Sequence, residues 1–467
     1  MSITRWLYEH SPVWWQNVMC TVAGWQKLRQ RYDRRFDERC AFLRQAGRWS
    51  PAEVAAYHQE QLRALAAHAC QRVPYYRRAF AEHGLRPEGL RTSADWSRLP
   101  LLSKDDVRRA GTTLIAEPWT ARQLVTSHSG GSTGMPLTCY HDREALADVY
   151  ASFWVYNRPS VRRGDRYATF QGMQLIPPGQ RGGPYWRMNR ANGQRLYSIF
   201  HLSEATIGLY LADLDAFAPV YMQGYANALY LVAQLARETG FSPRHAPAAV
   251  FSTSEQLKPH QRQTISEIFR TRVWDAYSQD ETCASISEYE CGYYHCDHAY
   301  GYVEFLDVET QGARRLAEIV CTGFLNRTWP LLRYRVGDLV EYEPADVCPR
   351  CGRAGPIIHA IRGRTGDVLL TPSGRHFPHI SLIVKNLRGV RELQLVQRAR
   401  DRVVIRYVPS EDHDRSRDEE AMVAAFAQAV GEPIHWSIER ANEIPRTRAG
   451  KFLSIVNEMK AEAASAG

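Results

Sequence analysis

A loop of small and hydroxyl-bearing residues has the composition of a phosphate-binding site. Residues 127–137 read SHSGGSTGMPL, so glycines would let the backbone approach an oxyanion and hydroxyl groups would add short donors. A Walker loop places a lysine directly after its last glycine, whereas Met135, Pro136 and Leu137 stand there in this chain. A phosphate site would therefore need positive charge from elsewhere, and a flexible surface loop is the alternative interpretation. The candidate contacts are Ser129, Gly130, Gly131, Ser132, Thr133 and Gly134.

Further motifs have to be read together with this loop. They are YSQDE at 277–281, RYRVGD at 333–338, RGRTGD at 362–367 and PRTRAGK at 445–451. Each of them is weak evidence alone. Their order and spacing resemble the adenylate-forming superfamily of acyl-CoA synthetases, peptide-synthetase adenylation domains and luciferases.

Other motifs narrow this resemblance to one branch. VPYYRR at 73–78, LPLLSKDDVR at 99–108 and CPRCGR at 348–353 resemble the phenylacetate-CoA ligases and their capsule-biosynthesis and coenzyme F390 synthetase relatives. The resemblance covers nearly the whole chain.

The resemblance implies a role for each matching residue. The loop at 129–134 would surround the ATP phosphates, and Glu281 would help to hold Mg²⁺, a hard cation that prefers carboxylates. Asp338 would accept hydrogen bonds from the ribose hydroxyls, with a turn cap as the alternative. Arg364 would lie beside the ribose, and Tyr277 beside the adenine or the acyl group. The remaining implied nucleotide contacts are Ser254, Glu255 and Ser278.

Lys451 would supply the positive charge that the phosphate loop lacks. It matches the lysine that, in the resembling family, reaches from the small domain to the substrate carboxylate and the α-phosphate. An ammonium group there neutralises charge as the carboxylate attacks phosphorus, and the site is complete only when the small domain closes. The chain departs from the family pattern at Ser278, Asp280, Gly366 and Leu137. These departures put details of nucleotide contact and domain switching in question.

A group of cysteine and histidine residues predicts a structural zinc site. Cys348 and Cys351 form a C-P-R-C-G knuckle whose thiolates could bind one tetrahedral ion at about 2.3 Å. Cys291 and His295 in ECGYYHCDH are the second pair, and the resemblance supports that choice. Two alternatives stay open: Cys296 and His298 as ligands, or unrelated buried thiols.

The composition bounds the class of protein. The chain of 467 residues has no apolar run of the roughly 20 residues that span a bilayer, and its start lacks the pattern of a signal peptide, so we expect a cytoplasmic protein. The net charge of +9 is spread among acidic residues, which disfavours a nucleic-acid partner and fits an anionic substrate. Tryptophans precede KLRQRYDRRF near the start; a packed helix with a solvated basic face is preferred there over a membrane-surface helix.

The pattern of the chain predicts an α/β fold with two domains. The first hundred residues are helical in pattern, and Ser103 could cap a short helix. Strands and helices then alternate, which is typical of a mostly parallel sheet with ligands at the carboxyl ends of its strands. We expect a large N-terminal domain at 1–363, with ATP, the carboxylic acid and the zinc knuckle. A small, mobile α+β domain at 364–467 would carry Lys451, with glycines at the hinge.

The predicted activity is that of an ATP-dependent carboxylate ligase. The acid would attack the α-phosphate to give an acyl adenylate and pyrophosphate, and a thiol, expected to be coenzyme A, would then displace AMP. An amine acceptor is the alternative, and a catalytically inactive zinc-knuckle binding module is the rival class. The acid itself cannot be read from the sequence, although Tyr225, Phe251, Ser252 and Tyr277 could line its pocket. A homodimer is left open.

Overall fold

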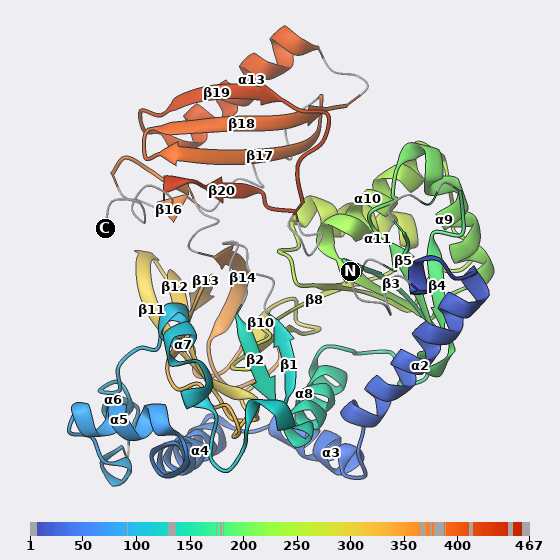
Figure 1. Ribbon diagram of the computed structural model, residues 1–467. Helices are drawn as coiled ribbons and strands as arrows, with labels where there is room; N and C mark the ends of the chain where they lie inside the picture. The colour runs from blue at the N-terminus through green and yellow to red at the C-terminus, as the bar shows by residue number, and fades with distance from the viewer. Residues whose placement is uncertain are drawn as a thin grey trace.

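The computed structural model has two parts, a large one built on a 12-stranded sheet and a small one built on a 4-stranded sheet (Figure 1). This is the predicted α/β architecture with a small second α+β domain. The structure describes residues 7–90, 92–128, 137–173, 175–177, 180, 182–364, 369–373, 376–377, 387, 389–410, 414–446 and 452–459.

Helices form the first part of the chain. Ser103 caps α7 by accepting a hydrogen bond from the backbone N–H of Asp106, while the Asp106 side chain accepts from the Ser103 backbone, as the sequence predicts for this position. Ser50 and Glu53 make the same capping box at the start of α4. The helices are α2 (Val13–Arg31), α3 (Phe36–Ala46), α4 (Pro51–Arg72), α5 (Pro74–Glu82), α6 (Ser93–Trp96) and α7 (Lys104–Ala110).

The large sheet is parallel only in its middle. The strand order is β11-β12-β13-β14-β10-β9-β8-β7-β6-β3-β5-β4. Parallel pairing joins β5, β3, β6, β7 and β8, and every other neighbour pair is antiparallel. The parallel strands are β3 (Tyr167–Gln171), β5 (Gln194–Ser198), β6 (Tyr221–Tyr225), β7 (Ala249–Thr253) and β8 (Val273–Ser278). The others are β4 (Trp186–Asn189), β9 (Ser285–Glu288), β10 (Tyr294–Cys296), β11 (Gly301–Gln311), β12 (Arg314–Gly323), β13 (Tyr334–Glu343) and β14 (Ile357–Arg364). Helices precede β6, β7 and β8 in the chain, whereas β4 lies between β3 and β5, and short connections join most of the strands after β8.

The two faces of the parallel strands have different coverings. On one face, α9 (Glu204–Phe217), α10 (Ala226–Glu238) and α11 (Pro259–Phe269) pack into a cluster with Phe170, Met222 and Val250. Residues one position away in the strands, such as Tyr221 and Phe251, point to the opposite face. That opposite face turns toward α8 (Arg143–Tyr156), which follows the hairpin of β1 (Val125–His128) and β2 (Thr138–His141).

Helix α2 packs on the edge of this sheet, yet its outer side is apolar. It contacts β4 through a close approach at Gly24, where an added Cβ would lie 2.2 Å from Asn189 Oδ1. The outer side exposes tryptophan and valine residues, with Trp14 64% exposed and Trp25 51% exposed. The expected packed helix is therefore present, and its exposed residues include the basic Lys27 and Arg29 as well as these apolar side chains.

The small part contains β17 (Val390–Ala399), β18 (Arg402–Pro409), β19 (His435–Arg440) and β20 (Ile455–Asn457) in the order β19-β18-β17-β20. Helix α13 (Arg415–Val430) packs on this sheet through a cluster that includes Phe426, Ile405 and Tyr407. A short hairpin joins β15 (Leu369–Leu370) and β16 (His376–Phe377). Because β14 of the large sheet ends at Arg364, the predicted boundary falls on the last residue of that strand.

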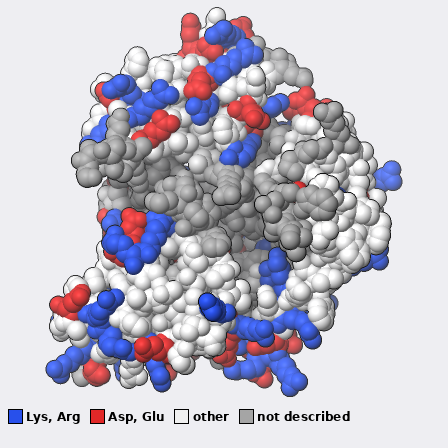
Figure 2. All heavy atoms as spheres, in the orientation of Figure 1, with Lys and Arg blue, Asp and Glu red and all other residues white. Residues whose placement is uncertain are grey.

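Charged side chains on the face shown in Figure 2 are of both signs and lie next to one another. This face shows no broad basic stripe among the described residues. No helix in the described ranges combines the length and the apolar content needed to cross a bilayer.

Candidate active site

A cavity of about 800 Å³ lies where the parallel strands end, as predicted for an α/β sheet. Its wall contains six of the residues predicted to bind the nucleotide or its metal ion: Ser254, Glu255, Tyr277, Ser278, Glu281 and Asp338. The predicted phosphate contacts Ser129, Gly130, Gly131, Ser132, Thr133 and Gly134, together with Lys451, lie outside the described residues. The side chain of Arg364 also lies outside the described part of the structure. The described neighbours Ser127, Gly363 and Phe452 line the cavity.

Asp338 is a buried carboxylate in the interior of strand β13. It is 7% exposed, and the Tyr277 hydroxyl donates to its Oδ2 atom over 2.6 Å. Burial first and the Asp338 charge second raise the pKa of Tyr277 well above its ordinary value, so the phenol stays protonated and acts as a donor. The backbone of Asp338 pairs with Arg364 in β14. The alternative role as a turn cap does not fit a position inside a strand.

Glu281 follows strand β8 and is also buried, at 5% exposure. Its Oε1 atom accepts a hydrogen bond from the Tyr334 hydroxyl over 2.9 Å and lies 3.8 Å from the Lys104 ammonium. The sequence analysis missed both neighbours. Lys104 belongs to the LPLLSKDDVR motif, which indicates the family resemblance but no contact with Glu281. No local feature of the sequence pairs Tyr334 with Glu281.

Glu255 contacts both parts of the molecule. Its Oε2 atom accepts from the backbone N–H and the side-chain amide of Asn227, over 3.0 and 2.9 Å. Its Oε1 atom accepts from the backbone N–H of Phe452 over 3.1 Å. The predicted nucleotide residue is therefore bonded, in this structure, to the start of α10 and to the segment that carries the predicted lysine. Its neighbour Ser254 is exposed and has a positive φ of 65°.

Comparisons with known proteins agree with this fold. A family model described as the CapK C-terminal domain matches residues 369–458. The chain is 24% identical over 462 residues to the protein CapK of Staphylococcus aureus, which covers 98% of this chain and 100% of the relative. It is 23% identical to the phenylacetate-coenzyme A ligase of Thermus thermophilus, over 87% of this chain and 97% of that one. The chain is therefore similar, over most of its length, to CapK and to the phenylacetate-CoA ligases.

The fold of the chain is also that of a solved structure. The crystal structure of a 2-hydroxyisobutyryl-CoA ligase, in its postadenylation state with an acyl-AMP, superposes with a TM-score of 0.68 at 19% identity. The match covers 90% of this chain and 93% of the other. The likeness extends through both the large and the small part, since neither alone would give that coverage.

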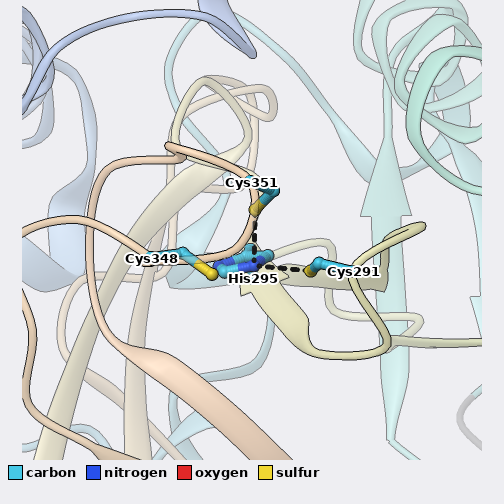
Figure 3. A group of neighbouring side chains, drawn as sticks. All are labelled: Cys291, His295, Cys348 and Cys351. Atoms are coloured by element: carbon cyan, nitrogen blue, oxygen red, sulfur yellow. Dashed lines mark hydrogen bonds between the residues drawn. The ribbon is translucent and has the colours of Figure 1, made fainter.

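The structure also brings together the four residues predicted to hold zinc (Figure 3). One ligand atom from each of Cys291, His295, Cys348 and Cys351 lies within 4.8 Å of all the others. His295 Nε2 is 3.5 Å from the Cys291 sulfur and 3.4 Å from the Cys351 sulfur. Three thiols and one imidazole in such a group are a donor set for a tetrahedral structural ion.

The alternative ligands point elsewhere. The Cys296 thiol belongs to the main apolar core, and the His298 ring interacts with the Ala354 carbonyl through Nε2 over 2.9 Å. Burial opposes ionisation of Cys348, but backbone hydrogen bonds from Arg350 and Cys351 to its sulfur prevail and lower the pKa of its thiol. A thiolate held by backbone N–H groups is the form that binds a metal.

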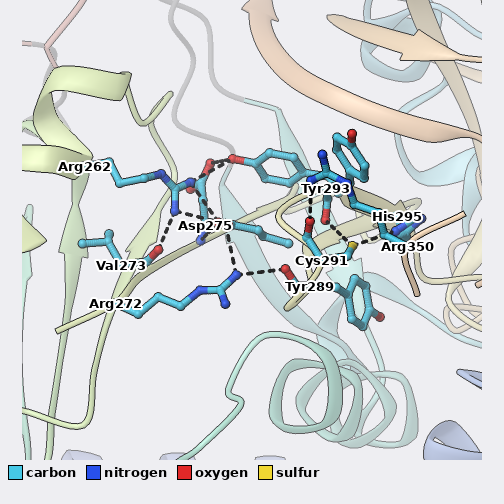
Figure 4. Close-up of polar contacts among 11 residues, drawn as sticks. Arg262, Arg272, Val273, Asp275, Tyr289, Cys291, Tyr293, His295 and Arg350 are labelled. Carbon is cyan, nitrogen blue, oxygen red and sulfur yellow. Dashed lines mark hydrogen bonds and ion pairs between the residues drawn. The ribbon is translucent and has the colours of Figure 1, made fainter. Parts of the chain in front are cut away.

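Strand β10 connects this metal group with the cavity (Figure 4). Successive residues of a strand point to opposite faces, so His295 faces the cysteines while Tyr294 donates to Asp275 Oδ2 over 2.8 Å. Asp275 lines the cavity, and burial raises its pKa to about 7. Arg262 pairs with Glu288, which accepts from the Asp275 backbone N–H. An ion that fixes β10 would thus also fix one wall of the cavity.

Proposed function

We propose that this chain is an ATP-dependent carboxylate ligase that forms an acyl adenylate and transfers the acyl group to a thiol, coenzyme A. A carboxylate oxygen of the acid forms a bond to the α-phosphorus, and the bond from that phosphorus to pyrophosphate breaks. The thiol then attacks the acyl carbon, and AMP leaves. The observation that carries the proposal is the buried pair of carboxylates, Asp338 and Glu281, in the wall of one cavity at the ends of the parallel strands.

The geometry gives these carboxylates different tasks. Asp338 is hydrogen-bonded to the phenol of Tyr277 and would accept from the ribose hydroxyls. Glu281 would hold Mg²⁺, which supplies positive charge for the phosphates, and Tyr334 and Lys104 would orient that carboxylate. The loop at 129–134, Arg364 and Lys451 would complete the site, and their roles rest on the sequence.

Exchange of pyrophosphate into ATP tests the proposal, since it reports adenylation before the acceptor is known. A panel of carboxylic acids should contain at least one that supports exchange, with AMP formed after coenzyme A is added. An amine that releases AMP where coenzyme A does not would move the acceptor to the alternative class. If no acid in the panel supports exchange, the result would favour the rival interpretation of an inactive binding module.

We predict that Asp338→Ala raises the Michaelis constant for ATP by roughly 10- to 100-fold, because hydrogen bonds to a charged acceptor contribute about 1.5–3 kcal/mol. Asp338→Asn keeps the size of the side chain and should have a smaller effect. Tyr277→Phe is the matched control, since it removes the protein partner of Asp338 and not the ribose acceptor. Steady-state kinetics on variants with a native melting temperature provide the measurement. An unchanged Michaelis constant for ATP in Asp338→Ala would exclude the ribose role.

We further propose that Cys291, His295, Cys348 and Cys351 bind one structural zinc ion. The support is the donor set and its compact arrangement. All four donors belong to the protein, which leaves no open position for substrate and fits a role in stability rather than catalysis.

A further inference from the structure

The cavity contains a buried arginine that the mechanism above does not use. Arg158 follows α8, lines the cavity and is only 3% exposed. Its guanidinium lies 3.9 Å from the ring centre of Phe153 and 4.2 Å from that of Phe251. Burial lowers the pKa of Arg158 to about 10, so the group remains charged at neutral pH.

This charge has no anionic partner in the described part of the chain. One terminal nitrogen donates to Gln223 Oε1 and the other to the Asn157 carbonyl, both over 2.7 Å. The Nε atom is buried without any hydrogen-bond partner. An arginine has five N–H donors, so three of them remain for a ligand. A buried cation without a counter-ion is strongly unfavourable, which implies that an anion completes the site.

Arg158 lies apart from the predicted nucleotide contacts. Gln223 and Phe251, which it touches, stand in the middle of β6 and β7, whereas Ser254 and Glu255 follow the end of β7. The titratable groups that raise the pKa of Arg158 are the phenols of Tyr221, Tyr167 and Tyr32, in that order, and none of them is a carboxylate. The deeper end of the cavity is therefore where the acid would extend away from the adenylate.

The wall beside Arg158 is polar. Gln223 and Gln194 both donate to the Thr169 hydroxyl, over 3.3 and 2.9 Å, and Asn189 donates to Gln194 over 3.1 Å. Asn189 Oδ1 is buried without a hydrogen-bond partner. A purely apolar acid would leave these groups and Arg158 unsatisfied, at a cost in binding free energy.

We propose that the carboxylic acid substrate carries a second carboxylate at its far end, and that Arg158 binds this group. The proposal rests on the proposed function, because it concerns the acid that is adenylated. The flat guanidinium matches a carboxylate through two parallel hydrogen bonds. Arg31 and Lys27 of α2 also line the cavity, and neither has an ion-pair partner within the described ranges. They would favour the entry of a doubly charged acid.

The test compares dicarboxylic acids with their monomethyl esters of equal length in the pyrophosphate exchange assay. We expect the diacid to be preferred in kcat/KM by about 100-fold, as for a buried charge pair. Arg158→Met keeps a side chain between the two rings and should abolish that preference. Arg163→Met is the matched control, because Arg163 stacks on Tyr32 and Phe36 but does not line the cavity. Equal use of ester and diacid by the unmodified chain would overturn the proposal.

Thermal melting separates this proposal from the proposed function. Replacing a buried charge by an apolar side chain commonly leaves the fold intact, and the melting curve of Arg158→Met checks this. Diacids without ATP should raise the melting temperature of the unmodified chain and not that of Arg158→Met. If no acid supports exchange but this stabilisation occurs, the adenylation proposal fails and the anion site stands. If no diacid stabilises the chain and none is preferred in exchange, the anion site is wrong.

The exposed side of α2 carries a second, independent inference. Trp14, Trp15, Val18, Val22 and Trp25 are between 41% and 64% exposed, and their spacing places them on one side of the helix. We call these five residues the α2 stripe. The helix lies along the outer edge of the large part in Figure 1. It has no acidic residue, and the guanidinium of Arg29 lies 4.1 Å from the Trp25 ring centre.

We infer that the α2 stripe binds an anionic membrane surface. Tryptophan rings beside an arginine side chain suit the boundary between headgroups and acyl chains, where the cation meets lipid phosphates. Arg29 is the basic residue beside the stripe, and the helix contains no carboxylate that would balance its charge, whereas Lys27 and Arg31 line the cavity. This positive charge favours an anionic lipid surface over a second copy, which would bring the same uncompensated cation to the interface.

Co-sedimentation with vesicles tests this inference. The chain should bind vesicles containing phosphatidylglycerol at least about tenfold better than pure phosphatidylcholine vesicles. The double variant with Trp14→Ser and Trp25→Ser should lose this binding. Trp119→Ser is the control, since Trp119 is 42% exposed outside α2. Absence of binding, or a dimer in sedimentation velocity that the double variant dissociates, would overturn the membrane assignment.

Discussion

Replacing Lys451 with alanine is expected to slow adenylation by roughly a hundredfold or more, as for the loss of one preorganised electrostatic group. The reason is the charge that builds up as the substrate carboxylate approaches the α-phosphate. Transfer from a chemically supplied acyl adenylate has already passed that step and should persist. The measurement compares pyrophosphate exchange with acyl transfer in the same variant, after circular dichroism has confirmed folding.

The contact beside Lys451 supplies a control for this prediction. The backbone N–H of Phe452 donates to Glu255, and the Phe452 ring lies 4.6 Å from the guanidinium of Arg446. Arg446→Ala therefore alters the placement of this segment without removing the ammonium group or a predicted nucleotide contact. Equal loss of both half-reactions in Lys451→Ala would assign the lysine to domain placement. If neither half-reaction is slowed, Lys451 lies away from the reacting groups.

The sequence was most informative where the motif itself is local. The cysteine and histidine pairs have the spacing of metal ligands, and the structure brings all four side chains together. The motifs also identified residues that line one cavity although they are far apart in the chain, such as Glu281 and Asp338. A family resemblance predicts that such residues lie together, because it implies the fold that brings the motifs to one site.

Contacts between residues that are far apart in the sequence could not be predicted where no motif links them. The Asp338 carboxylate accepts from Tyr277 because β8 and β13 lie in one sheet, and nothing local to either residue indicates this. Arg158 stands in the polar segment RPSVRRGD, where each arginine suggests a solvated side chain. Only the packing of Phe153 and Phe251 around it reveals a buried charge. The outward side of α2 was likewise unpredictable, because its two sides both contain apolar residues.

Loss of the structural zinc is the second large effect that we predict. Cys351→Ser should reduce the zinc content from about one ion per chain to near zero and lower the melting temperature by roughly 5 °C or more. Cys351 is exposed, so its thiol contributes little packing, and a loss of stability would have to come from the metal. The zinc would otherwise clamp β10 to the knuckle at 348–351 and so hold the wall that contains Asp275.

Cys70→Ser is the matched control for the zinc prediction. Cys70 is a partly buried thiol in α4 outside the metal group, so this variant should keep its zinc. Elemental analysis gives the zinc content, and melting curves with and without a chelator give the stability. The chelator should destabilise the unmodified chain and Cys70→Ser and should leave Cys351→Ser unchanged. The prediction is wrong if Cys351→Ser retains its zinc, or if the chelator has no effect on the unmodified chain. The four side chains would then be neighbours that do not bind a common ion.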